Sequence, residues 1–216
     1  MQLRITTQKE ACVQEEAIYH LIIESFQQWT EYGLYHSYLS FERFQKIMEQ
    51  ATVFVAIDTE TQELVGTHTI SVNKKKNRAY GNLLAVLPKA KHKGIATKML
   101  KYEEELIRKD GYDYLQENTA VPAFWSVNWH LKNGYRIIGY KCSARNNHYT
   151  YVFRKQLSPS LFWSGPLAPI TARLHFMLSY TVTRLCKTST GQLTLLGRIG
   201  KKVRDKVKKK KETAKF

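Results

Sequence analysis

Apolar residues along the chain alternate between the two-residue period of strands and the 3.6-residue period of helices. Between residues 11 and 26, Ile18, Leu21 and Ile22 fall on one helical face, which predicts an amphipathic helix. Helical spacing returns over residues 91–109. The other expected elements are helices 41–50 and 122–133 and strands 3–6, 53–57, 64–72, 80–87, 112–119, 135–140 and 148–153. This order predicts a mixed α/β domain.

Charge is spread unevenly along the chain. Residues 1–157 carry 21 Lys and Arg against 16 Asp and Glu, whereas residues 158–216 carry 13 against 2. Three of the five prolines follow shortly after Leu157. We therefore expect a domain over residues 1–157 and a basic, amphipathic C-terminal extension over residues 158–216.

The three cysteines, Cys12, Cys142 and Cys186, are odd in number, widely spaced and without a metal-ligand pattern. This usage favours a reducing compartment and predicts no metal site. The N-terminus has no apolar core of the signal-peptide type. A cytoplasmic location is the resulting expectation.

A basic turn separates the strand that ends at residue 87 from the helix that follows. Pro88 ends the strand because proline has no N–H for a sheet ladder. Lys91, Lys93 and Gly94 then precede the first residues with helical spacing. Free N–H groups at a helix N-terminus, beside lysines, form a site suited to phosphate. The alternative is an ordinary strand–helix turn with solvated lysines.

Two segments carry a family resemblance. Lys91-x-x-Gly94-x-Ala96 resembles the (Arg/Gln)-x-x-Gly-x-(Gly/Ala) pyrophosphate loop of the GNAT N-acetyltransferase superfamily. Residues 123–135, which end in Gly134-Tyr135, resemble the family's later helix before its Gly-(Phe/Tyr) pair. The resemblance covers residues 1–156. It implies a mostly antiparallel mixed sheet, flanked by helices and splayed near Ala85, with helix 91–109 beginning at the splay.

The resemblance also implies acetyl-CoA as co-substrate. Its pyrophosphate would lie on the backbone of residues 92–96 and its pantetheine along residues 84–86. The chain departs from the family at Lys91, where arginine or glutamine is usual, and at Ala123, where an asparagine commonly contacts the coenzyme. The implied coenzyme-binding residues are Leu84, Ala85, Val86, Lys91, His92, Lys93, Gly94, Ile95, Ala96 and Thr97.

The implied reaction is direct attack of a primary amine on the thioester in a ternary complex. Many relatives place a tyrosine four residues before the Gly-Phe pair, and here that position is His130. His130 is therefore the candidate acid for the leaving thiolate, although packing is an alternative role. Candidate bases are His68 and Glu117, and a water-relayed mechanism without a dedicated base is equally consistent. The alternation of apolar and polar residues around His68 does not determine which face of the sheet its side chain takes.

Residues 29–38 are rich in aromatic rings with polar tips. Tyr32, Tyr35 and Tyr38 are the candidate substrate-binding residues, because such rings suit an amine-bearing small molecule or peptide. The same residues would also suit an ordinary connection between two helices.

The extension combines an apolar stripe with positive charge. Residues 193–211 mix apolar positions with nine lysines and arginines, a pattern suited to an anionic membrane surface. Nucleic acid is less favoured because no aromatic residue lies between Tyr180 and Phe216. A packed helix with a solvated lysine tail is the plainer alternative. The stripe comprises Leu167, Ile170, Leu174, Met177, Leu178 and Leu185.

The rival function is a weak or inactive GNAT-like binding module held on membrane or RNA by this tail.

Overall fold

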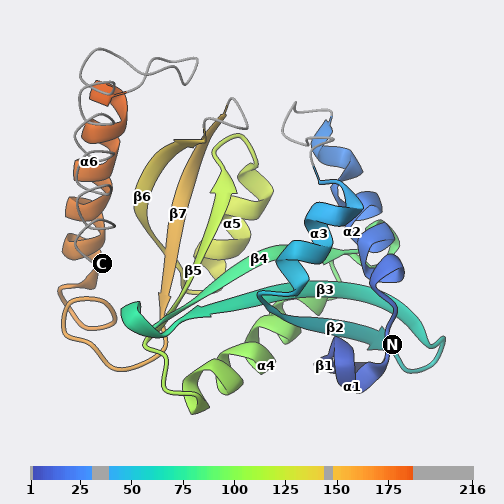
Figure 1. Ribbon diagram of the computed structural model, residues 1–216. Helices are drawn as coiled ribbons and strands as arrows, with labels where there is room; N and C mark the ends of the chain where they lie inside the picture. Colours follow the sequence, from blue (N-terminus) through green and yellow to red (C-terminus); the bar gives the residue numbers. More distant parts are fainter. Residues whose placement is uncertain (1, 31–38, 144–147, 187–216) are drawn as a thin grey trace, which may run out of the picture.

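Seven strands form one sheet in the order β1-β2-β3-β4-β5-β7-β6 (Figure 1). The computed structural model describes residues 2–30, 39–143 and 148–186. The strands are β1 (Leu3–Thr7), β2 (Thr52–Asp58), β3 (Glu63–Asn73), β4 (Arg78–Val86), β5 (Tyr114–Ala120), β6 (Arg136–Ser143) and β7 (His148–Gln156).

The sheet opens between its two parallel strands. β4 and β5 pair only from Arg78 to Tyr80, opposite Tyr114 to Gln116, and every other neighbouring pair is antiparallel. The two strands separate from Gly81 onward, so Ala85 lies within the splayed part. The predicted mixed α/β fold with a splayed, mostly antiparallel sheet is confirmed.

Helices cover both faces of strands β2 to β4, with α2 and α4 on opposite sides (Figure 1). Each buries its apolar stripe against the sheet, Ile18 and Ile22 from α2 and Met99 and Leu100 from α4. The helices are α1 (Gln8–Ala11), α2 (Glu15–Thr30), α3 (Phe41–Met48), α4 (Ile95–Lys109), α5 (Phe124–Lys132) and α6 (Ala168–Cys186), and the 3-10 turns are Lys74–Lys76 and Pro88–Ala90.

Two helix starts differ from the predictions. The helix expected over residues 11–26 is interrupted: α1 ends before Cys12, which takes a left-handed φ of 54°, and α2 begins at Glu15. The helix expected over residues 91–109 begins only at Ile95, because Gly94 has a φ of 75° that a helix does not tolerate. Residues 91–94 therefore form a turn in front of α4.

Helix α6 lies along β6, the last strand of the sheet (Figure 1). Helix α6 therefore packs on the sheet, and the expected division near Ser158 stays a prediction. The basic amphipathic segment 193–211 lies outside the described residues. Among the described helices, none has the length and apolarity needed to cross a membrane.

Candidate active site

A cavity of about 520 Å³ opens where the sheet splays. Its walls come from the end of α2, the splayed end of β4, the turn before α4 and one face of α5. All of the coenzyme-binding residues expected from the sequence line this cavity except Lys93, which is exposed on the turn. The lining residues are Ser25, Phe26, Trp29, Leu84, Ala85, Val86, Ala90, Lys91, His92, Gly94, Ile95, Ala96, Thr97, Trp125, Ser126, Trp129 and Lys132.

The splayed end of strand β4 lines the cavity, and one of its edges is not paired with another strand there. A bulge places Leu83 and Leu84 opposite the single residue His68 of β3, and Leu83 has a φ of 54°. Beyond Tyr80 the other edge of β4 has no β5 partner. Main-chain N–H and C=O groups on this edge are therefore available to an extended, amide-bearing ligand, as at any exposed sheet edge.

The N-terminus of α4 forms the basic end of the cavity. Gly94 is its N-cap, with no side-chain hydrogen bond to the first turn, and a Cβ on Gly94 would meet no atom within 4 Å. The first N–H groups of any α-helix have no partner inside the helix, and they point at a bound anion. Lys91 and His92 line the same end, and partial burial lowers the pKa of Lys91 from its usual value.

Aromatic residues of α2 and α5 form a further wall of the cavity. Trp29 belongs to the aromatic segment 29–38 singled out from the sequence, but the sequence interpretation gave no role to Trp125 or Trp129. The rings of Trp29 and Trp125 meet edge to face, 5.6 Å apart, and so join the ends of two helices far apart in the chain. Trp125 and Trp129 lie four residues apart on α5. This i, i+4 spacing was the available signal that both face the same way.

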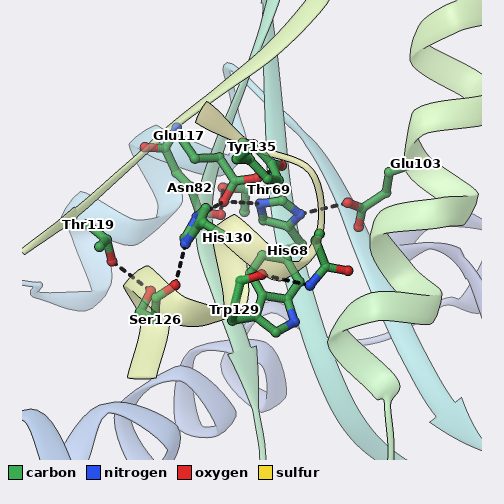
Figure 2. A network of polar contacts seen from close by, with 11 residues as sticks. His68, Thr69, Asn82, Glu103, Glu117, Thr119, Ser126, Trp129, His130 and Tyr135 are labelled. Atoms are coloured by element: carbon green, nitrogen blue, oxygen red, sulfur yellow. Dashed lines mark hydrogen bonds and ion pairs between the residues drawn. The ribbon is translucent and has the colours of Figure 1, made fainter. Parts of the chain in front are cut away.

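Glu117 of β5 is the centre of a buried polar cluster (Figure 2). The hydroxyl of Tyr135 donates to Oε1 of Glu117. Nε2 of His130, on α5, lies 3.1 Å from Oε2 of the same carboxylate. Nε2 of His68, on β3, lies 4.0 Å from Oε2. The three residues proposed from the sequence as catalytic are thus brought together from three separate elements.

Helix α4 contributes to the cluster through Glu103. Its Oε2 lies 2.7 Å from Nδ1 of His68, and both side chains are fully buried. Nε2 of His68 has no hydrogen-bond partner among the residues that the structure describes. The cluster lies against β4 at Gly81, where a Cβ would be 2.6 Å from that nitrogen and 2.8 Å from Cγ of Glu117. Only glycine fits at this point.

The cluster shifts the acid–base properties of its members. Burial by itself raises the pKa of Glu117, but the hydrogen bond from His130, the nearby histidine charges and the hydrogen bond from Tyr135 outweigh it and lower that pKa to about 2. Burial and the Glu117 charge raise the pKa of Tyr135 well above its usual value. Burial lowers the pKa of His68, but Glu103 and Glu117 outweigh this and the net change is upward. Glu117 is therefore an ionised hydrogen-bond acceptor at neutral pH.

His130 is enclosed beside the cavity. Its Nδ1 lies 2.7 Å from the carbonyl oxygen of Ser126, and its ring stacks on Phe153 with centroids 4.5 Å apart. It contacts Ser126 and Trp129, which line the cavity, but neither His130 nor His68 nor Glu117 is itself a lining residue.

The sequence interpretation missed Glu103, Tyr135 and Gly81, whose roles depend on contacts between elements. The substrate candidates Tyr32, Tyr35 and Tyr38 lie outside the described residues. In the described part of the chain, no group of three or more His, Cys, Asp and Glu could hold a metal ion.

The sequence of the chain matches the model of a known protein family. The model for the Acetyltransferase (GNAT) family matches residues 15–135, more than half of the chain. The chain belongs to the GNAT acetyltransferase family. Family membership indicates acyl transfer as the general activity, and the matched segment contains both the uncapped start of α4 and the buried cluster.

Solved GNAT structures share the fold at low sequence identity. The ribosomal-protein-S18-alanine N-acetyltransferase from Escherichia coli is 12% identical, with a TM-score of 0.58, over 74% of this chain and 96% of its own. A GNAT acetyltransferase from Elizabethkingia anophelis, solved with acetyl-CoA, is 13% identical, with a TM-score of 0.55, over 71% and 97%. An acetyltransferase from Bacillus subtilis in complex with CoA is 16% identical, with a TM-score of 0.56, over 73% and 100%. No curated protein sequence matches the chain.

Proposed function

We propose that this GNAT protein transfers an acetyl group from acetyl-CoA to a primary amine by direct attack within a ternary complex. The observation that carries the proposal is the cavity, which places the uncapped N-terminus of α4 beside the open edge of β4. One end suits a phosphate and the other suits an amide-bearing chain. Structural neighbours solved with acetyl-CoA or CoA support this assignment.

The cavity suggests how the coenzyme would be held. The pyrophosphate would accept hydrogen bonds from the first turn of α4, next to Lys91, and the pantetheine would lie along residues 84–86. Bound there, acetyl-CoA supplies an activated thioester. A main-chain N–H on the open edge of β4 would then stabilise the oxyanion formed during transfer.

Proton removal from the amine is best assigned to water. A free aliphatic amine has a pKa of about 10.4 and must lose a proton before it attacks. Neither His68 nor Glu117 lines the cavity, and among the described residues their side-chain hydrogen bonds and ion pairs reach only other members of the buried cluster. Glu117 is also a weak base because its pKa is lowered to about 2. We therefore favour the water-relayed mechanism, with these two residues setting the charge of the cluster.

Proton delivery to the thiolate is assigned to His130. Each of its ring nitrogens faces an oxygen acceptor, the Ser126 carbonyl on one side and the Glu117 carboxylate on the other. A ring nitrogen held beside an oxygen acceptor is positioned as a hydrogen-bond donor, and proton donation is the function that a general acid requires. His130 also contacts Ser126 and Trp129 of the cavity wall.

Coenzyme binding is tested by Gly94→Asp, with Gly94→Asn as the matched control. Both side chains tolerate a left-handed backbone better than most, and they differ chiefly in charge. We expect calorimetry to show CoA binding at least tenfold weaker for the aspartate variant than for the asparagine variant, because the carboxylate would lie beside phosphate. Equal affinity in two folded variants would remove this turn from the site.

The same titration separates the enzyme from the rival binding module. An enzyme should bind CoA and also turn over acetyl-CoA with at least one member of a panel of small amines and peptide N-termini. The peptides belong in the panel because the structural neighbour from E. coli is named for an alanine of ribosomal protein S18. CoA binding without turnover across the panel would favour the module.

The role of His130 is tested by His130→Phe, compared with Tyr135→Phe. Each variant removes one hydrogen bond to Glu117 and keeps a ring of similar size. If His130 donates the proton, its variant should lose about 10²-fold or more in kcat with little change in CoA affinity, whereas Tyr135→Phe should lose much less. Equal losses of kcat in the two variants would show that His130 acts only as a hydrogen-bond partner of Glu117 and not as the proton donor.

A further inference from the structure

Helix α6 turns its apolar stripe away from the sheet. The stripe expected from the sequence, which we call the outward stripe, is between 39% and 68% exposed. None of the described residues covers it. An amphipathic helix of a globular protein normally buries such a stripe. The outward stripe consists of Leu167, directly before α6, and of Ile170, Leu174, Met177, Leu178 and Leu185 on the helix.

Small and hydroxyl-bearing residues hold the opposite side of α6 against β6. Ala168 and Ala172 are buried there. The hydroxyl of Ser179 donates to the carbonyl of Tyr140 at 2.6 Å and accepts from its N–H at 2.7 Å, and Thr183 donates to the same carbonyl at 2.8 Å. These bonds fix which side of the helix faces outward, so the exposure of the stripe is built into the fold.

The charge of α6 and of the sequence that follows it is strongly positive. The sequence contains no Asp or Glu from residue 158 to residue 204. Arg173 and Arg184 are exposed on α6 itself, and residues 187–216 add eleven Lys and Arg against two acidic residues. An exposed aliphatic stripe bordered by positive charge alone is the composition of helices that lie on anionic membranes.

We propose that the outward stripe of α6 docks this protein on the surface of an anionic lipid bilayer. The helix lies in the plane of the interface, because its other side is occupied by β6 and only the stripe is free to enter the acyl boundary. Arg173 and Arg184 face the lipid phosphates, and the net positive charge of the sequence that follows α6 adds to the attraction. This inference is independent of the proposed acetyl transfer.

The aliphatic character of the stripe favours lipid over nucleic acid. Positive charge alone would serve either partner, but single-stranded nucleic acids bind through stacking on aromatic rings. The aromatic rings of α6 are engaged elsewhere: Phe176 and Tyr180 both pack on Tyr140 of β6. Leu174, Met177 and Leu178 offer no stacking surface.

Flotation of the full-length protein with liposomes tests the proposal. Vesicles of phosphatidylcholine alone are compared with vesicles containing about one third phosphatidylserine, at low and high salt. We expect binding to the anionic vesicles that weakens with salt because the charges are screened. Leu174→Ser with Leu178→Ser should weaken it at least tenfold. The matched control is Val72→Ser with Leu131→Ser, two comparably exposed apolar residues away from α6, which should bind as the wild type does.

Other outcomes overturn the proposal. Absence of binding to anionic vesicles at low salt, or unchanged binding of the Leu174 and Leu178 double variant, would do so directly. A large drop in thermal stability of that variant would show that another part of the chain covers the stripe. Dimers in sedimentation that the variant abolishes, without vesicle binding, would show a second copy there. Tight RNA binding in place of vesicle binding would assign the surface to nucleic acid.

Discussion

Helices α4 and α6 share an apolar stripe in their sequences, but the stripe of α4 faces the sheet and the stripe of α6 faces away from it. Both have apolar residues at helical spacing and lie beside the same sheet. In α4 the aliphatic side faces the sheet, and Leu100 is 1% exposed, whereas in α6 the aliphatic side faces out, and Leu174 is 62% exposed. Apolar periodicity therefore identifies a helix without telling which of its sides the domain will bury.

The surface that each helix meets explains the difference. Helix α4 covers the apolar faces of strands β1 to β4, where aliphatic side chains lose water contact and stabilise the fold. Helix α6 meets β6, an edge strand whose main-chain groups need hydrogen-bond partners. Hydroxyls from Ser179 and Thr183 fulfil that need at Tyr140, and aliphatic side chains would leave it unmet.

The sharpest way to break the comparison is the same substitution in both helices. Leu100→Ala should lower the free energy of unfolding by about 2–5 kcal/mol, because it leaves a cavity in the core. Leu174→Ala should change it by less than about 0.5 kcal/mol, because the side chain is already in water. Urea denaturation of both variants measures the two values. Similar losses would mean that the stripe of α6 is buried in solution.

A second difference between the helices concerns pH. The inward side of α4 reaches the buried cluster through Glu103, whereas the inward side of α6 carries no charged residue. The pKa of Glu117 is about 2 in the folded protein and 4.5 as an ordinary value. The ionised carboxylate therefore stabilises the fold above pH 4.5, and its contribution, about 3 kcal/mol, is lost as the pH falls from 4.5 towards 2.

Glu117→Gln should remove this acid-side dependence. Its free energy of unfolding should vary less than that of the wild type between pH 4.5 and 2, because the amide does not titrate. The exposed Glu105→Gln of α4 is the control and should follow the wild-type curve. Parallel curves for the wild type and the Glu117 variant would show that the cluster does not stabilise the ionised carboxylate.

The smallest expected effect is on the hydrogen bonds that hold α6 against β6. Ser179→Ala removes both hydrogen bonds between this side chain and Tyr140, at a cost of about 1 kcal/mol, because water partly replaces them at this half-buried site. Thr181→Ala on the exposed side should be neutral or slightly stabilising, since alanine is the better helix former. Thermal unfolding compares the two. A larger effect at Thr181 would reverse the assignment of the two sides.

Much of the cavity was predictable from local sequence. Pro88 and Gly94 control the backbone around themselves, so the turn before α4 could be predicted from these residues. The coenzyme-binding residues near the turn were implied by the resemblance of Lys91-x-x-Gly94-x-Ala96 to the GNAT pyrophosphate loop. The aromatic wall was harder to predict, because Trp29 and Trp125 meet only after the ends of α2 and α5 are brought together. The functions of His130, His68 and Glu117 stay predictions, although the fold does place them in one cluster.

The sequence by itself determined the order and kind of the elements, the turn before α4 and the strong positive charge of the C-terminal part, because these depend on neighbouring residues and composition. Only the tertiary structure decided which face His68 takes, that Gly81 leaves room for the cluster, and that the stripe of α6 faces outward. Those features arise from contacts between strands and helices distant in the chain. Periodicity along the sequence reports that a helix or strand has two sides, and packing against the rest of the molecule selects between them.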